Sequence, residues 1–325
     1  MTSHRAAGST HTELMKALSN ISEIARLTSI LPKRIRTSLA RRTDRPFVEI
    51  CLDVGRVPEL RYLSVSGSEL VYDVGLVTHA DIEEISADLD FSSDNRAGLP
   101  GTLHRISAIR NRAGNIDGLT CRIGSEIPDI LQGLDIYGPE NLLFLGPPMS
   151  GKTSYLRSIA KELSQTRRVL IVDTSDEICG GAGVPHESVG SARRMSVSHR
   201  SMQHEVLIEA VQNHSPEVII VDELGTVAEV EAARTIAERG VRLISTVHGT
   251  TLENLIANPS MNILVGGVDH VTIGDLGAVK RGGKKTVSER ITQPVFDTVI
   301  ELGSGRGIKV LTGVAKLVDC ILRRR

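Results

Sequence analysis

Aromatic side chains are scarce in this chain of 325 residues, which contains four Phe, four Tyr and no Trp. Proteins that hold single-stranded nucleic acid by stacking its bases use aromatic platforms, so the composition disfavours that mode of binding. An excess of one charge is also lacking, because 38 Lys and Arg are matched by 39 Asp and Glu. The sequence therefore excludes a general basic field, and any contact with nucleic acid would have to be local.

Cysteines and long apolar runs are the next absences. Cys51, Cys121, Cys179 and Cys320 lie far apart and form no Cys-x-x-Cys pair, which argues against a zinc site or a disulfide framework and favours a reducing compartment. No apolar run approaches the roughly 18–20 residues of a membrane-spanning helix, and no signal-peptide core follows Met1. These absences predict a soluble intracellular protein.

The most informative stretch is residues 141–163, NLLFLGPPMSGKTSYLRSIAKEL, which reads as strand, turn and helix. The turn at 146–153 fits the phosphate-loop pattern G-x-x-x-x-G-K-[ST]. The backbone N–H groups of such a loop cradle phosphate oxygens, while Lys152 reaches the β- and γ-phosphates and Thr153 ligates Mg²⁺. The strand and helix on either side oppose the alternative of a chance glycine turn. The predicted nucleotide-binding residues are Gly146, Pro147, Pro148, Met149, Ser150, Gly151, Lys152, Thr153 and Ser154.

A second acidic motif, VIIVDE at residues 218–223, follows about 70 residues downstream. An aspartate after a buried strand is the second half of a nucleoside-triphosphate site, so Asp222 is predicted to hold Mg²⁺ together with Thr153. Glu223 is placed to orient or deprotonate the attacking water. At the end of another apolar run, 241–247, Thr246 and His248 are positioned to sense the γ-phosphate. For His248 the residues alone leave a histidine satisfied by loop backbone as an equal alternative.

The order of the elements predicts an α/β fold. Continuous apolar strands alternate with helices from residue 141 onward, which is typical of a mostly parallel sheet covered by helices on both faces, with ligand at the carboxyl ends of the strands. A small α/β domain is predicted before it, with strands at 47–52, 60–65 and 70–74, a helix at 80–89 and a hairpin over 103–123. The predicted division is 1–45 as a disordered start (1–12) and a basic helical segment, 46–124 as the small domain, 125–290 as the phosphate-loop domain and 291–325 as a strand and helix extension.

Residues 1–45 hold nine Lys and Arg and three acidic residues. This segment is interpreted either as the solvated face of two helices, the favoured reading, or as a docking arm for nucleic acid or an acidic partner.

Together, GPPMSGKT, VDTSDEI, VPH, ARRM, QHEVLIEAV, PEVIIVDELGT, AARTIAERGV and STVHG resemble the cyanobacterial and plastid ATPases related to stage III sporulation protein AA, and more distantly the secretion and pilus-retraction ATPases. DNRAGLPGTLHRISAIRNR extends the resemblance into the first domain. It implies a RecA-like, AAA+ or additional-strand catalytic-glutamate ATPase, with Asp222 as the Walker B aspartate and Glu223, Lys152 and His248 as catalytic residues. Many such proteins continue into a C-terminal Arg-x-x-x-His nucleic-acid domain, which is not expected after the short helix predicted at 314–322.

The predicted function is Mg²⁺-dependent ATP hydrolysis that drives a conformational cycle in a homo-oligomer; the expected assembly is a ring, with a hexamer as a candidate form. A GTPase is disfavoured because no N-K-x-D motif follows, whereas a phosphate-loop kinase and a nucleotide-dependent nucleic-acid-binding or scaffold protein remain alternatives. A nucleic-acid or protein partner is open, and the location is cytoplasmic, or plastid if the source is a plant or alga. An arginine from a neighbouring subunit is expected at the γ-phosphate; the first candidates are Arg193 and Arg194, the second Arg105, Arg110 and Arg112.

Overall fold

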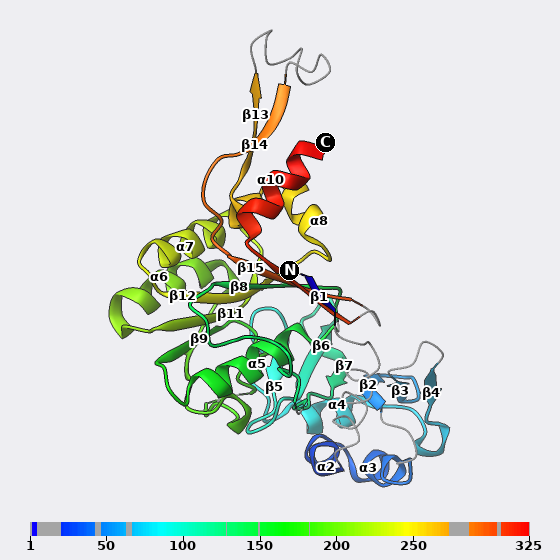
Figure 1. Ribbon diagram of the computed structural model, residues 1–325. Coiled ribbons are helices and arrows are strands. Elements are labelled where there is room, and N and C mark those ends of the chain that lie inside the picture. The colour runs from blue at the N-terminus through cyan, green and yellow to red at the C-terminus, as the bar shows by residue number, and fades with distance from the viewer. Residues whose placement is uncertain are drawn as a thin grey trace.

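The computed structural model describes residues 2–4, 21–42, 47–62, 67–127, 129–148, 150–181, 183–272, 286–303 and 307–324. The chain forms an N-terminal part built on one sheet and a larger part built on another, with a two-stranded hairpin projecting from the larger part (Figure 1). No helix among these residues is both long enough and apolar enough to cross a membrane.

The central sheet of the larger part has the order β1-β16-β15-β8-β12-β11-β9-β10. The strands from β15 to β10 run parallel, and β16 and β1 add to the β15 edge in antiparallel pairs. The mostly parallel sheet is therefore confirmed, and β12 lies between the phosphate-loop strand β8 and β11. The strands are β1 (Thr2–His4), β8 (Leu142–Leu145), β9 (Val169–Asp173), β10 (Arg193–Ser196), β11 (Val218–Leu224), β12 (Arg242–Val247), β15 (Thr298–Leu302) and β16 (Ile308–Thr312).

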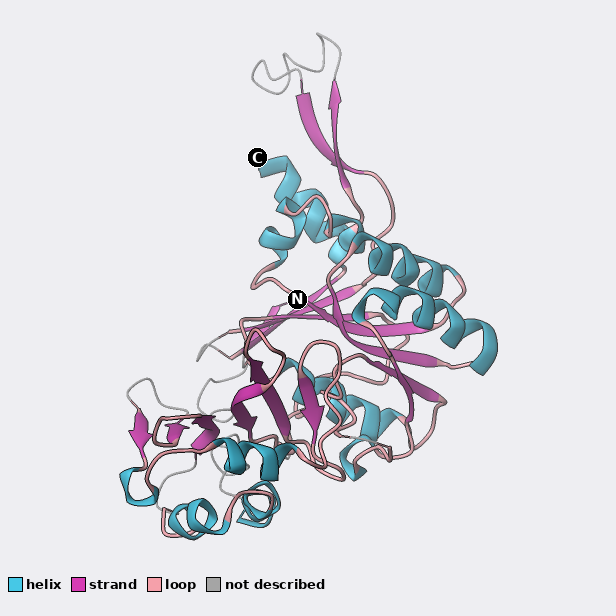
Figure 2. Ribbon diagram, turned by 180° about the vertical axis from the view of Figure 1, so that it is seen from behind, coloured by secondary structure: helices cyan, strands magenta, loops and turns pink. Residues whose placement is uncertain are grey.

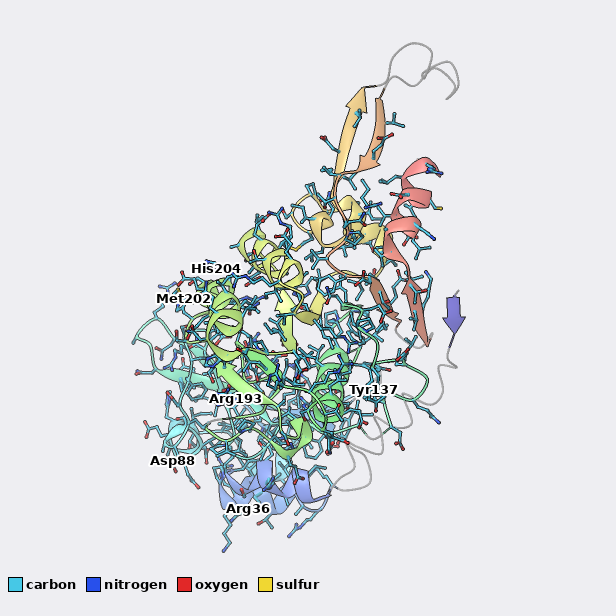
Figure 3. The ribbon with its side chains drawn as sticks, turned by 60° about the vertical axis from the view of Figure 1, so that its left-hand side comes forward. Arg36, Asp88, Tyr137, Arg193, Met202 and His204 are labelled. Atoms are coloured by element: carbon cyan, nitrogen blue, oxygen red, sulfur yellow. The ribbon has the colours of Figure 1, made fainter. Side chains whose placement is uncertain are left out.

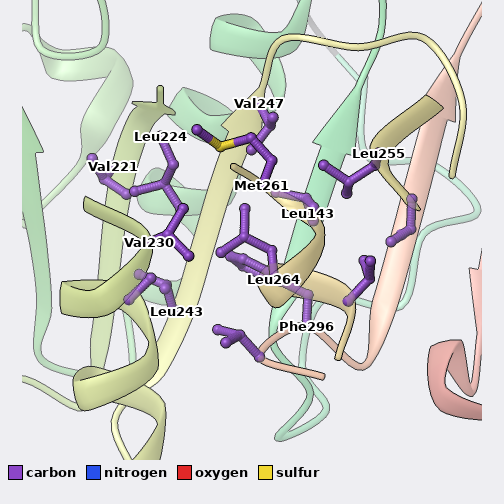
Figure 4. Close-up of a cluster of buried hydrophobic side chains, with 14 of the residues drawn as sticks. Leu143, Val221, Leu224, Val230, Leu243, Val247, Leu255, Met261, Leu264 and Phe296 are labelled. Atoms are coloured by element: carbon purple, nitrogen blue, oxygen red, sulfur yellow. The ribbon is translucent and has the colours of Figure 1, made fainter. Parts of the chain in front are cut away.

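Helices cover both faces of this sheet (Figure 2). Successive residues of a strand point to opposite faces, so each buried strand contributes side chains to an apolar core on either side. Helix α5 (Lys152–Leu163) packs Leu156 and Ile159 on one face. The other face is covered by α6 (Gln203–His214), α7 (Val227–Glu238), α8 (Leu252–Ala257), the 3₁₀ turn η4 (Asn262–Val265) and α10 (Val314–Arg324). Figure 4 shows the centre of that second core, in which Leu143, Val221 and Leu243 of the sheet meet side chains of the covering elements.

Local signals fix the ends of the helices next to the site. Thr226 and Glu229 form a capping box at the start of α7, where each side chain accepts a hydrogen bond from the other residue's backbone N–H. Gly240 follows the helix with a φ of 73°, a left-handed conformation that favours glycine. The sequence predicts a helix over 226–239 with Gly240 as its stop, and the structure confirms both.

The projecting hairpin consists of β13 (Val268–Thr272) and β14 (Thr286–Arg290), an antiparallel pair that the sequence analysis did not predict. Its base is anchored by an ion pair of 3.0 Å between Arg290 Nε of β14 and Asp319 Oδ1 of α10. Beyond the hairpin, β15 pairs in parallel with β8, so residues 298–302 belong to the central sheet.

The N-terminal part is a six-stranded antiparallel sheet of order β4-β3-β2-β7-β6-β5. Leu27 of helix α2 (Ile21–Ser29), Ile35 of helix α3 (Lys33–Leu39) and Leu31 between the two helices are buried in the same core as this sheet. The boundary predicted at residue 45 would separate the helices from the sheet; the division into domains stays a prediction. The remaining elements are β2 (Phe47–Asp53), β3 (Glu59–Tyr62), β4 (Ser68–Leu70), η1 (Tyr72–Val74), α4 (His79–Ser86), β5 (Arg96–Gly98), β6 (Arg105–Arg110) and β7 (Ile116–Arg122).

Two expectations for this part were wrong. Residues 70–74 were predicted as a strand, but only Leu70 belongs to one, and Tyr72–Val74 is a 3₁₀ turn. Residues 1–12 were predicted to be disordered, but Thr2–His4 pairs with β16; residues 5–12 lie outside the described part. In both places, pairing partners distant in sequence decide the conformation, and a local pattern does not contain them.

Two arginines of the basic segment pair with acids of the N-terminal part. Arg34 pairs with Asp81, and Arg42 pairs with Glu69 and Asp73 at 2.8 Å each. Arg36 lies exposed on α3 and donates to the carbonyl of Ser29 (Figure 3). This pairing favours the interpretation of a solvated helix face.

The two parts of the chain meet at a pair of glycines without space for a side chain. A Cβ on Gly98 of β5 would lie 2.3 Å from the Cα of Gly181, and the adjacent Gly181 N–H donates to the carbonyl of Thr102 at 3.1 Å. Backbone therefore packs directly on backbone, and any side chain there must push the two parts apart.

The first prediction concerns this junction. Gly98→Ala is expected to lower the free energy of unfolding by about 1–3 kcal/mol, the usual cost of overpacking, measured as a lower urea midpoint. Gly67→Ala is the control, because its Cβ would meet the nearest atom, of Tyr62, at an ordinary 3.6 Å. Equal midpoints for the two variants would contradict the close approach.

Candidate nucleotide-binding site

A cavity of about 470 Å³ opens at the carboxyl ends of the parallel strands, between the larger part and the N-terminal sheet. Its size is typical of small-molecule sites, and it brings together the phosphate loop, the two acidic strand ends and basic residues of the N-terminal part. The residues that line it are Val48, Arg96, Leu103, Arg105, Arg122, Ile123, Gly124, Ser125, Ile127, Pro148, Ser150, Gly151, Lys152, Thr153, Ser154, Arg157, Thr174, Ser175, Asp176, Glu177, Arg200, Gln203, Asp222, Glu223, Thr246 and His248.

The phosphate loop curls between β8 and the start of α5. Gly151 has a φ of 89°, which a residue with a Cβ rarely adopts, and Lys152 begins the helix. The Lys152 ammonium donates to the carbonyls of Gly146 at 2.6 Å and Pro147 at 3.0 Å, so it lies over the loop that is expected to hold phosphate. Burial lowers the pKa of Lys152 from its ordinary value, and an anion beside it would offset that effect.

Two further details of the loop fit a phosphate. A Cβ on Gly146 would meet Ser150 Oγ at 2.6 Å and the carbonyl of Leu302 at 2.9 Å, so only glycine fits there. The Ser150 hydroxyl is buried and has no hydrogen-bond partner among the described residues, although buried polar groups are normally paired. Of the residues predicted to bind nucleotide, Pro148, Ser150, Gly151, Lys152, Thr153 and Ser154 line the cavity and Gly146 and Pro147 do not, while Met149 lies outside the described residues.

Thr153 and Asp222, which are predicted to hold Mg²⁺, lie next to each other. The Thr153 hydroxyl donates to Asp222 Oδ1 at 3.3 Å. Burial raises the pKa of Asp222 well above its ordinary value, and the charges of Glu177, Asp173 and Glu223 raise it further. Among the described residues no cluster of three or more His, Cys, Asp and Glu could hold a metal alone. A single carboxylate and a hydroxyl, completed by phosphate oxygens, are the donors that suit Mg²⁺.

A bulge in β11 lets two consecutive carboxylates serve one cavity. The pairing of β11 with β12 shifts between Val221 and Glu223, so that Val221 lies opposite Ser245 and Glu223 opposite Thr246. In a regular strand, neighbouring side chains point to opposite faces of the sheet, and a bulge re-aims one of them. Asp222 and Glu223 consequently both line the cavity.

Glu223 lies at the centre of a polar cluster. Its Oε1 is 2.9 Å from His248 Nε2 and 3.1 Å from Arg200 Nη2. Thr246, the other predicted residue at the tip of β12, donates its hydroxyl to the carbonyl of Asp222. The structure therefore brings His248 and Thr246 to the acidic strand end, as predicted, although the catalytic role of His248 stays a prediction.

Sequence analysis missed two residues that contact Glu223. Arg200 lies in the 3₁₀ turn η3 (Arg200–Met202) and pairs with its carboxylate. Gln203, the first residue of α6, is 4% exposed and donates from Nε2 to the carbonyl of Glu223 at 2.7 Å, while its Oε1 accepts from the Thr174 hydroxyl. The one available signal was the QHEVLIEAV stretch, which was used for the resemblance but not given a role.

A second polar cluster lies on the wall that the N-terminal part contributes. Arg96 Nη1 is 3.2 Å from Glu177 Oε1, and Arg105 pairs with the same oxygen. Burial lowers the pKa of Arg105. These arginines thus reach the cavity of their own chain, whereas Arg105 was considered for a neighbouring subunit's site.

The other arginines proposed to act on a neighbouring subunit differ in their position and partners. Residues 193 and 194 were expected in a loop, but they lie in the edge strand β10. Arg194 is turned inward, because its Nη1 donates to the carbonyl of Gly180 at 3.1 Å and lies 3.4 Å from Asp176. Arg194 is therefore engaged within its own chain, and its role at a neighbouring subunit's γ-phosphate stays a prediction. Arg193 is exposed on the edge strand (Figure 3), and Arg110 donates to Asn95 and Gly114 outside the cavity lining.

The second prediction tests the Gln203 bridge. Gln203→Ala would leave the Glu223 carbonyl and the Thr174 hydroxyl without this partner, and a buried polar group left unpaired costs about 1–3 kcal/mol. We expect a lower urea midpoint together with slower ATP turnover, because the backbone that carries Glu223 loses its support. Gln212→Ala, at an exposed position of the same helix, should change neither measurement; a fall in both variants would show a general effect on α6.

Comparison with known proteins gives a consistent result. Residues 104–277 match the family described as sporulation stage III, protein AA. The chain is 43% identical over 320 residues to "Uncharacterized protein ycf45" of Porphyra purpurea, covering 93% of this chain and 54% of that protein. It is 44% identical over 307 residues to "Protein SEEDLING PLASTID DEVELOPMENT 1" of Arabidopsis thaliana, covering 92% and 44%. It thus spans about half the length of these relatives.

Among solved structures, the chain is similar to the pilus retraction motor PilT with bound ADP. The TM-score is 0.51 at 18% identity, and the match covers 88% of this chain and 86% of that one. At this identity the likeness concerns the fold alone, and it agrees with the predicted RecA-like phosphate-loop core.

Proposed function

The chain belongs to the sporulation stage III protein AA family, and from this membership and the chemistry of the cavity we propose that it binds ATP with Mg²⁺ and hydrolyses it. The observation that carries the proposal is the meeting of Lys152, Thr153, Asp222 and Glu223 in one cavity at the carboxyl ends of parallel strands. Each of these side chains matches one requirement of phosphoryl transfer to water.

Binding would rest on the loop and its lysine. Backbone N–H groups at the start of α5 and the Lys152 ammonium would bind the β- and γ-phosphates. The Ser150 hydroxyl, buried and without a partner among the described residues, would donate to a phosphate oxygen. Thr153 and Asp222 would hold Mg²⁺, which when bound supplies positive charge to the phosphate oxygens.

Hydrolysis would use Glu223 as the base. A water oxygen forms a bond to the γ-phosphorus, the bond from that phosphorus to the β–γ bridging oxygen breaks, and the water proton passes to the Glu223 carboxylate. ADP leaves with the electron pair of the broken bond. The 2.9 Å contact with His248 and the Gln203 bond to the Glu223 backbone support a fixed position for this carboxylate.

The wider proposal is that hydrolysis drives a conformational cycle in a homo-oligomer, with a ring as the leading form and a hexamer as the candidate number of subunits. The name of the Arabidopsis relative supports a plastid location where the source has plastids. A nucleic-acid or protein partner would be moved or remodelled by this cycle.

The test is phosphate release by the purified chain from Mg-ATP, with GTP and Mg²⁺-free ATP compared. We expect turnover with Mg-ATP that stops on removal of Mg²⁺. Tight ATP binding without measurable release would overturn hydrolysis in favour of a nucleotide-dependent scaffold, and transfer of the γ-phosphate to a substrate hydroxyl would indicate a kinase.

A further inference from the structure

The arginines that line the cavity differ in their ion-pair and hydrogen-bond partners. Arg96 and Arg105 share Glu177, and Arg122 pairs with Glu49. Arg157 is 6% exposed and donates to the carbonyls of Ile178 and Glu177. Arg200 is different, because its partner is Glu223, the carboxylate proposed to activate water.

The Arg200 side chain is also exposed enough to move, and it has N–H donors beyond the one that contacts Glu223. Its side chain is 55% exposed, and one Nη2 contact of 3.1 Å to Glu223 is the bond that joins it to the site. A guanidinium carries five N–H donors in a planar fork that matches phosphate oxygens. Arg200 lies on the 3₁₀ turn directly before α6. The buried Gln203 holds the start of that helix against the Glu223 backbone.

The Arg200–Glu223 pair has a consequence for hydrolysis. Glu223 Oε1 already accepts a hydrogen bond from Arg200 and lies 2.9 Å from His248 Nε2, so this oxygen is occupied where a water would have to approach it. A γ-phosphoryl group beside Glu223 brings negative charge that competes for the same guanidinium, and charge-assisted bonds to phosphate are strong. When ATP is bound, its γ-phosphate is therefore a second acceptor, to which Arg200 can move its hydrogen bond from Glu223.

We propose that Arg200 is a further catalytic residue of the same chain: it transfers its hydrogen bonds from Glu223 to the γ-phosphoryl group of bound ATP, which stabilises the transition state and frees Glu223 to accept the water proton. This inference rests on the proposed ATP hydrolysis. It supplies from within the chain the second cation that was expected from a neighbour.

Affinity for ATP relative to ADP tests the contact, because only ATP carries the γ-phosphate. Calorimetry with ADP and with the non-hydrolysable β,γ-imido analogue of ATP is run on wild type, Arg200→Ala, Arg200→Lys and the control Arg234→Ala. Arg234 is an arginine of α7 with 44% exposure, paired with Glu231 away from the cavity lining.

Arg200→Ala is expected to lower the affinity for the β,γ-imido analogue of ATP by about 10- to 100-fold, the contribution of charge-assisted hydrogen bonds. Its affinity for ADP should fall by less than about twofold. Its kcat for ATP should fall by about 10²-fold or more, with Arg200→Lys between it and wild type and Arg234→Ala unchanged. Equal effects on both nucleotides, no effect on either, or a raised kcat would each overturn the proposal, the last because Arg200 would then merely restrain Glu223. If wild type itself binds neither nucleotide, the proposed function fails instead.

Mixing subunits tests the assignment to the same chain. Arg200→Ala and Glu223→Gln proteins, each with low activity, are combined and assayed. Because both residues serve one site in the proposal, no mixed assembly contains an intact site by exchange, and activity should stay at the sum of the two. Recovery of turnover in the mixture would show that Arg200 acts on a neighbour's nucleotide and would overturn the same-chain role.

Discussion

Replacement of Lys152 by alanine is expected to abolish tight ATP binding. The ammonium is the only charged group among the described residues of the phosphate loop, and it lies over that loop, 2.6 Å from the Gly146 carbonyl. Its charge-assisted bonds to the β- and γ-phosphates would be lost together with its charge. At about 1.5–3 kcal/mol for each such bond, two bonds correspond to a loss of about 10²–10⁴ in affinity.

Lys161→Ala is the matched control for this variant. Lys161 lies on the same helix, α5, and pairs with Glu126 at 2.7 Å on the outside of the cavity. Calorimetry should show wild-type ATP affinity for Lys161→Ala and no measurable binding for Lys152→Ala. Undiminished affinity in Lys152→Ala would remove the assignment of residues 146–153 as a phosphate loop.

Glu223→Gln should separate binding from turnover. The amide keeps the size of the side chain and can still contact His248, but it cannot take a proton from water, so turnover should fall by about 10²–10⁴ while Mg-ATP binds nearly normally. Glu231→Gln, on the exposed side of α7 in an ion pair with Arg234, should leave both unchanged.

Persistent turnover in Glu223→Gln would move the base elsewhere in the cavity. Glu177 would be next, although its carboxylate is already held by Arg96 and Arg105. If the prediction holds, the ATP-trapped variant is also the form in which a nucleic-acid or protein partner should co-purify, since the cycle stops before release.

The sequence was most informative where a local pattern determines a local structure. The glycine positions of the phosphate loop, the helix stop at Gly240 and the apolar runs of β9, β11 and β12 all act over a few residues, and each matches the structure. The meeting of Thr153 with Asp222 could be predicted as well, because parallel strands place their carboxyl ends at one edge.

What could not be predicted depends on contacts distant in sequence. The bulge that turns both Asp222 and Glu223 into the cavity is set by pairing with β12, and VIIVDE has no mark of it. Arg200 and Gln203 acquire their roles because the turn η3 and the start of α6 contact Glu223 at the end of β11, so their spacing from Glu223 along the chain has no meaning in advance. The inward turn of Arg194 similarly depends on the positions of Asp176, Gly180 and Gly183.

The contacts of Glu177 have a thermodynamic consequence for the whole molecule. Arg96 and Arg105 belong to the N-terminal sheet, Glu177 belongs to the segment after β9, and the glycine pair at 98 and 181 holds the same two surfaces together without a cushioning side chain. A ligand that alters the charge around Glu177 therefore changes the free energy of docking between the two parts. Linkage is reciprocal. A partner that binds the N-terminal sheet and shifts it must change the affinity for nucleotide by a certain factor, and nucleotide must change the affinity for that partner by the same factor.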